Sequence, residues 1–169
     1  MVKEKYIIKA KEIMRGILMD EFMRRAVQLA VDNVKNGGEP FGAVLVKDGE
    51  IVAEGINETH QTFDISGHAE MLAIRRAQES LKTLDLSGYV MYASGEPCPM
   101  CLGAMYMSGI TEGYYCASIE DAKEYGLGGS VIIYDNFKKS REDRDLVMKQ
   151  MPIEAGQENP LEQYVNRNG

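Results

Sequence analysis

Two short motifs constrain this chain most, because they hold two of its three cysteines and one of its two histidines. His68 lies in the segment GHAE, and Cys98 and Cys101 lie in EPCPMC. The two cysteines are spaced i and i+3, so their thiols point the same way on the first turn of a helix. A helix N-terminus also favours the thiolate, which is the form that binds metals. Two thiolates and one imidazole suit zinc, so we expect the fold to bring both motifs together.

Glu70 gives this candidate metal site a chemical role. His68 and Glu70 are spaced i and i+2 and do not share a helical face, which makes Glu70 a poor fourth ligand. Three protein ligands leave one zinc position open, as in catalytic sites, where a bound water ionises near neutral pH. A carboxylate beside the metal can take up that proton and pass it on. A structural zinc site usually has a second CxxC half, which this chain lacks.

Composition limits the class of protein and of partner. A length of 169 residues indicates one domain, and 44% hydrophobic with 27% charged residues is ordinary for a globular protein. The net charge of −7 disfavours a nucleic acid as partner, because proteins that hold a phosphate backbone usually present a basic face. Three cysteines are not a disulfide framework. No apolar run reaches the ~20 residues of a membrane helix, and no signal peptide is evident, so we expect a cytoplasmic protein.

The order of predicted elements indicates an α/β fold. A helical period over residues 19–38 is followed by two strands within 41–55, which flank an Asp48-Gly49 turn. The elements that follow are a helix over 68–81, a strand over 88–94, a helix over 98–109, a strand over 113–118, a weak helix over 119–125, a strand at SVIIY (130–134), and helices near 141–150 and 160–166. This alternation predicts a mixed sheet with helices on both faces, and ligands at the carboxyl ends of its strands.

The order HxE followed by PCxxC is the signature of zinc-dependent nucleobase deaminases. With the hairpin PFGAVLVKDGEIVAEG, these motifs make roughly residues 19–140 resemble the cytidine-deaminase-like superfamily. The resemblance implies a three-layer α/β/α fold with a five-stranded mixed sheet, and assembly into homodimers or larger oligomers. It also implies one zinc ion per subunit, held by the ligands His68, Cys98 and Cys101, with Glu70 as the catalytic proton shuttle. We expect residues 1–18 to be an N-terminal extension and residues 19–169 to form the deaminase domain.

Within this superfamily, EPFGAVLVKDG is most similar to the small bacterial guanine deaminases, whereas tRNA adenosine deaminases tend to have a small aliphatic residue in place of Phe41. The resemblance implies that guanine is hydrolysed to xanthine with release of ammonia. It also implies that Asn57, after the hairpin, and Asp121, in SIEDAKEYG, contact the purine. Phe41 and Ala69 complete the expected substrate-binding residues.

Two features depart from the pattern of the guanine deaminases. The tail NPLEQYVNRNG has Tyr164 as its one aromatic residue, and Gly128 and Gly129 stand where those enzymes carry bulkier polar side chains. The sequence therefore leaves open a guanosine deaminase, a tRNA adenosine deaminase, and a cytosine or cytidine deaminase. A non-catalytic zinc protein is a further alternative, against which Glu70 argues, because a structural site needs no spare acid.

Overall fold

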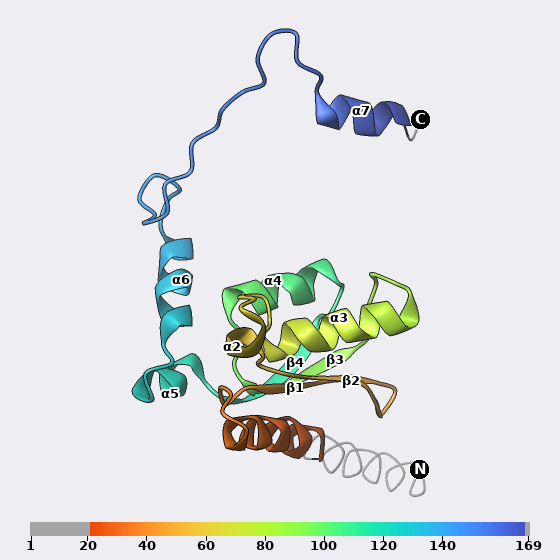
Figure 1. Ribbon diagram of the computed structural model, residues 1–169, viewed down its shortest axis with the longest axis vertical. Helices are drawn as coiled ribbons and strands as arrows, with labels where there is room; N and C mark the ends of the chain where they lie inside the picture. The colour runs from red at the N-terminus through yellow and green to blue at the C-terminus, as the bar shows by residue number, and fades with distance from the viewer. Residues whose placement is uncertain (1–20, 168–169) are drawn as a thin grey trace, which may run out of the picture. The chain divides into compact units, whose positions relative to one another are not determined.

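A computed structural model of the chain describes residues 21–167, so the predicted extension over residues 1–18 lies outside the described residues. The described part divides into two compact units, one up to Tyr134 and one from Asp135 onward. The first unit holds the sheet and the candidate metal ligands (Figure 1). No helix within residues 21–167 is both long enough and apolar enough to cross a membrane.

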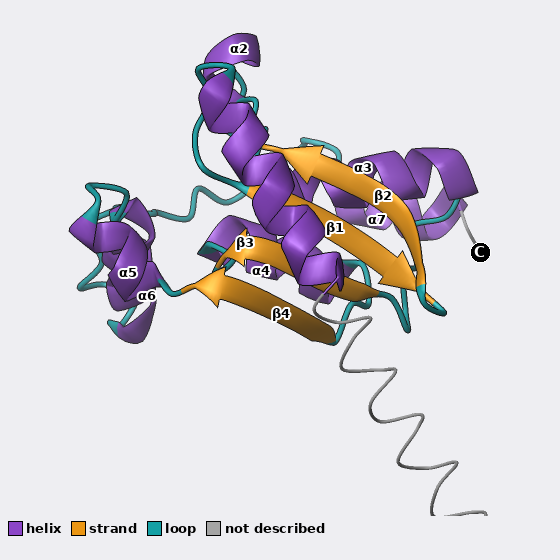
Figure 2. Cartoon of the chain, turned by 90° about the horizontal axis from the view of Figure 1, so that it is seen from below, coloured by secondary structure: helices purple, strands orange, loops and turns teal. Residues whose placement is uncertain are grey.

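The sheet of the first unit has four strands in the order β2-β1-β3-β4. Its strands are β1 (Gly42–Lys47), β2 (Glu50–Ile56), β3 (Val90–Gly95) and β4 (Glu112–Ala117). β1 is antiparallel to β2 and β3, whereas β3 and β4 are parallel, so the sheet is mixed and β4 forms an edge (Figure 2). The predicted hairpin is confirmed: Asp48 and Gly49 both have positive φ, as a two-residue hairpin turn requires.

Helices cover both faces of the sheet (Figure 1). The helix of residues 21–35 lies on one face, and α3 (Ala69–Leu81) and α4 (Pro99–Met107) lie on the other. Successive side chains of a strand point to opposite faces, so Val44 packs with Phe22 of the first helix, whereas Leu45 packs with α3. The remaining helices are α2 (Thr59–Thr62), α5 (Ile119–Glu124), α6 (Gly129–Lys138) and α7 (Pro160–Arg167).

The predicted fifth strand is wrong, because residues 130–134 belong to helix α6. The run Val131-Ile132-Ile133 has strong β propensity, but the structure makes it part of a ten-residue helix. Ser130 and Ile133 line one cavity and are spaced i and i+3, which only a helix places on one side. The predicted helix near 141–150 is also absent from the described residues, where that segment forms turns and irregular structure. The predicted helices over 119–125 and 160–166 are confirmed.

Candidate metal centre and active site

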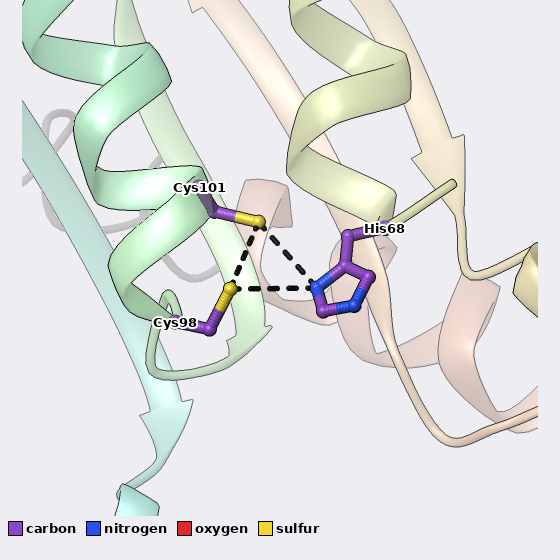
Figure 3. A group of neighbouring side chains, drawn as sticks. All are labelled: His68, Cys98 and Cys101. Atoms are coloured by element: carbon purple, nitrogen blue, oxygen red, sulfur yellow. Dashed lines mark hydrogen bonds between the residues drawn. The ribbon is translucent and has the colours of Figure 1, made fainter. Parts of the chain in front are cut away.

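The three candidate ligands lie at the starts of two helices. His68 is the N-cap of α3, and Cys98 is the N-cap of α4, both with extended backbone. Pro99 takes the first helical position of α4, where its missing N–H costs nothing. Cys101 follows within the first turn of α4 and is fully buried. The predicted convergence of the two motifs is therefore confirmed (Figure 3).

The ligand atoms form a nearly equilateral triangle (Figure 3). The Nδ1 atom of His68 lies 3.5 Å from the Cys98 sulfur and 3.6 Å from the Cys101 sulfur, and the two sulfurs are 3.6 Å apart. Tetrahedral zinc, with Zn–S of ~2.3 Å and Zn–N of ~2.0–2.1 Å, sets its ligand atoms about 3.5–3.8 Å apart. The donor set and its spacing therefore fit a zinc ion that keeps one position open.

The pKa values of the three ligands depend on one another, so metal binding is linked to the loss of protons. The hydrogen bond shared with Cys101 and the neighbouring His68 lower the pKa of Cys98 to about 4. The same hydrogen bond, together with burial, raises the pKa of Cys101. The hydrogen bond to Cys98 raises the pKa of His68. Cysteines bind zinc as thiolates, so the proton that the raised pKa favours on Cys101 would be released when zinc binds.

Glu70 lies on the first turn of α3, and only 7% of its surface is exposed. Burial raises its pKa, because a poorly solvated carboxylate is less stable in the ionised form. Its side chain hydrogen-bonds with Cys101 and lines the same cavity as His68 and Cys98. A carboxyl group with a raised pKa beside a metal site is suited to accept a proton and return it.

A cavity of about 400 Å³ opens onto His68, Cys98 and Glu70, whereas Cys101 is fully buried. This volume is in the range of small-molecule sites. Its apolar wall is made by Phe41, Ile65, Met100, Leu127 and Ile133. Its other two carboxylates belong to Glu39 and Glu96. An aromatic and aliphatic wall with a few polar groups suits a flat heteroaromatic ring.

The four predicted substrate-binding residues differ in their position relative to the cavity. Phe41 lines the cavity. Asn57 is 1% exposed and reaches the cavity wall through Glu39, to which its side-chain amide donates a 3.0 Å hydrogen bond. Ala69 is buried under the wall, where α3 packs closely against Gly55.

Asp121 does not line the described cavity. It is exposed and forms a capping box with Ser118 at the start of α5. Its carboxylate accepts hydrogen bonds from the Ser118 amide and hydroxyl at 2.8 and 2.7 Å, and these bonds lower the pKa of Asp121. The roles of all four residues in substrate binding stay predictions.

Two residues at or next to the site are not among the predicted site residues. Glu39 lines the cavity, and the hydroxyl of Tyr134 donates a 2.9 Å hydrogen bond to the carbonyl of Pro97, next to the ligand Cys98. Glu39 lies only two residues ahead of Phe41, and that position is the one signal that could have indicated it. Tyr134 could not be predicted as a site residue, because its segment has the composition of a strand.

Comparison with known proteins identifies the family. Residues 18–117 match the family described as the cytidine and deoxycytidylate deaminase zinc-binding region. This chain belongs to that family. Its members are zinc-dependent deaminases, and His68, Cys98 and Cys101 are the zinc-binding group of this one.

Individual relatives of this deaminase include enzymes for bases and for tRNA. The guanine deaminase of Bacillus subtilis is 43% identical over 135 residues, which are 79% of this chain and 86% of that protein. Its crystal structure superposes with a TM-score of 0.79 at 39% identity, covering 89% of this chain and 94% of that one. A tRNA-specific adenosine deaminase of Aquifex aeolicus is 32% identical over 137 residues, 81% of this chain and 87% of that protein. A guanine deaminase of Nitrosomonas europaea superposes with a TM-score of 0.59 at 31% identity over 62% of both chains.

Proposed function

We propose that this deaminase converts guanine to xanthine by hydrolysis, with release of ammonia. The observation that carries the proposal is the cavity in which the zinc ligands and the buried acid Glu70 share an apolar wall with Phe41. The crystal structure of the Bacillus subtilis guanine deaminase supports guanine as the substrate. Its TM-score is higher, and its superposition covers more of both chains, than for a tRNA deaminase structure, whose TM-score is 0.57.

Zinc held by His68, Cys98 and Cys101 would lower the pKa of water at the open position toward neutrality. Glu70 takes up the proton that the water loses, and the oxygen of that water forms a bond to the amine-bearing carbon of the ring. Glu70 delivers the proton to the ring nitrogen next to that carbon. Glu70 then passes the second proton of the water to the amino group as the C–N bond breaks, so that ammonia leaves and a carbonyl remains. Burial of Glu70 supports both steps, since it brings the acid and base forms closer in free energy at neutral pH.

The remaining residues of the wall hold the ring. Phe41 and Leu127 offer apolar surface to a planar base, and Asn57 supplies a hydrogen-bond donor through its amide nitrogen. Ala69 supports α3 beneath Glu70. We keep Asp121 as a candidate for contact with the base, although its carboxylate first has to leave the α5 cap.

We also propose that the protein forms a homodimer through α4 and the edge strand β4. A groove of about 220 Å³ lies between them, and its lining includes Tyr106 and Tyr115, whose exposed fractions are 72% and 49%. Exposed aromatic side chains along an unpaired strand edge are typical of an interface. Light scattering coupled to size-exclusion chromatography should give twice the 18.8 kDa chain mass, and Tyr106→Glu should shift it to the single-chain mass.

The test of the proposed reaction is ammonia and xanthine release by the zinc-loaded protein. The substrate panel contains guanine, guanosine, adenine, cytosine, cytidine and tRNA, with Glu70→Ala as the blank. Turnover of guanine well above the other substrates is the expected result. Preferential turnover of tRNA or of a pyrimidine would contradict the assignment of guanine while leaving the zinc chemistry intact.

A further inference from the structure

We infer that Glu39 is a specificity-determining residue, whose carboxylate accepts a hydrogen bond from an N–H or O–H group of the substrate other than the reacting amino group. The inference rests on the proposed function, because it concerns the cavity in which that reaction takes place. The reacting amino group must lie at the zinc ligands and Glu70. The carboxylate of Glu39 in the same wall is therefore available to bind another polar group of the substrate.

The backbone holds Glu39 and Asn57 side by side. The buried side chain of Asn33 donates from its Nδ2 atom to both carbonyl oxygens, at 2.8 Å to Glu39 and 2.8 Å to Asn57. The amide of Phe41 donates to the same Glu39 carbonyl at 2.8 Å, and the amide of Asn57 donates to the carbonyl of Phe41 at 3.0 Å. The loop ahead of β1 and the end of β2 are therefore one hydrogen-bonded unit. The backbone of both Glu39 and Asn57 is fixed by these bonds.

The side-chain amide of Asn57 has only one orientation that satisfies its neighbours. Its Oδ1 atom accepts from the backbone amide of Thr59 at 3.1 Å and from the hydroxyl of Thr59 at 2.8 Å. Its Nδ2 atom donates to Oε2 of Glu39 at 3.0 Å. A flipped amide would set its carbonyl against the Glu39 carboxylate and its NH₂ against a backbone N–H. The amide nitrogen of Asn57 therefore faces the carboxylate of Glu39.

This arrangement leaves the second oxygen of Glu39 for a ligand. Oε2 is bonded to Asn57, whereas no described residue donates to Oε1, and the side chain lines the cavity. A carboxylate is an acceptor only, and hydrogen bonds to a charged acceptor are about twice as strong as neutral ones. The negative charge also disfavours a phosphate at this position, which selects against nucleotides and tRNA.

Two kinds of donor carry the required chemistry. One is an imidazole-ring N–H of a free purine base, at N7 or N9, and the other is a sugar hydroxyl of a nucleoside. Both place a donor opposite Oε1 of Glu39, which lines the cavity.

The test combines the variant Glu39→Gln with substrates that lack the donor. In Glu39→Gln the amide oxygen has to accept from Asn57, so the new NH₂ group faces the substrate donor and opposes it. The substrates are guanine, 7-methylguanine, 9-methylguanine and guanosine, and kcat and KM are measured for each with zinc-loaded protein. The matched control is Glu50→Gln, which makes the same charge change at the exposed start of β2.

For the wild type, we expect the methyl group that blocks the recognised N–H to lower kcat/KM by about 10- to 100-fold relative to guanine. Glu39→Gln should lower kcat/KM for guanine by a similar factor and leave the blocked base within about threefold. If the donor is a sugar hydroxyl, the wild type prefers guanosine to 9-methylguanine, and Glu39→Gln removes that preference. Either pattern supports the inference and identifies the donor.

A uniform loss on all four substrates, or no loss, overturns the inference, because a merely structural role of Glu39 would not discriminate between them. Wild-type protein that turns over none of the four contradicts the proposed function itself. The two failures are therefore distinguishable, since the first occurs only with an active wild type. Zinc content and circular dichroism of each variant confirm that the comparison is made between folded, loaded proteins.

Discussion

The two sides of the cavity are built in opposite ways. The zinc ligands and Glu70 stand on α3 and α4, whose inner residues are packed into the core of the sheet. The opposite wall, from Gly126 to Ile133, is rich in glycine. It comprises the turn ahead of α6 and the first residues of α6, a helix with no buried residue. The difference indicates that the chemistry is placed on the best-packed elements of the fold, whereas the shape of the pocket depends on a segment with little packing of its own. Such a segment can change between relatives without loss of the metal centre.

The largest effect is expected at the metal side. Cys98→Ala should abolish zinc binding and deamination, because two ligands cannot hold the ion in the triangle that three ligands form. Zinc content per chain, measured by plasma mass spectrometry, checks this expectation. Cys116→Ala is the matched control, since Cys116 is exposed on β4 and outside the ligand group. A full zinc complement in Cys98→Ala would remove Cys98 from the ligand set.

Glu70→Gln separates the chemistry from the metal. The amide keeps the size of the buried side chain but cannot carry a proton between water and base, so kcat should fall by about 10²- to 10⁴-fold with zinc retained. Glu96→Gln is the control, because Glu96 also lines the cavity, and its oxygen can still accept the 3.1 Å hydrogen bond from the amide of Ile119. Near-normal turnover by Glu70→Gln would rule out its role as proton shuttle.

A pair of glycine variants compares the packing of the two sides directly. A Cβ atom on Gly55 would overlap the backbone carbonyl of Ala69 at the start of α3, so Gly55→Ala should lower the free energy of unfolding by about 1–3 kcal/mol or more. A Cβ atom on Gly129 meets open space, and Gly129→Ala should stay within about 0.5 kcal/mol. Urea denaturation of both variants measures the difference. Equal losses would show that α6 is packed as tightly as α3.

The smallest effect is expected where the two sides meet. Tyr134→Phe removes the hydrogen bond from α6 to the carbonyl of Pro97, which should cost about 1 kcal/mol of stability. Zinc content should not change. KM should rise by a few fold with kcat nearly constant, because the cavity wall formed by α6 loses a hydrogen bond while Glu70 is unchanged. Tyr125→Phe, at an exposed tyrosine beyond the cavity wall, is the control. A loss of zinc in Tyr134→Phe would instead show that this hydrogen bond holds Cys98 in place.

Local spacing and a pair of motifs were sufficient for the catalytic side. The i, i+3 cysteines and the Asp48-Gly49 turn depend on contacts between residues close in sequence. His68 lies 30 residues from Cys98, and it could be assigned because the order HxE and then PCxxC is a specific signature. The ligand triangle and the hairpin could therefore be predicted correctly. The residues that shape the substrate could not, because their neighbours come from distant parts of the chain. Asn57, for example, reaches the cavity wall through Glu39, which lies 18 residues earlier in the chain.

What the amino-acid order alone established is the chemistry of this protein: a zinc site with an open position, an acid beside it and an α/β sheet to carry them. The tertiary structure decided which residues form the wall of the cavity and which of them can contact the substrate. It turned the β-prone run at 130–134 into a helix against the cavity, and it placed Glu39 beside Asn57 through the buried amide of Asn33. The physical reason is that motifs encode short-range geometry, whereas the free energy of packing and of buried hydrogen bonds depends on which segments meet after folding.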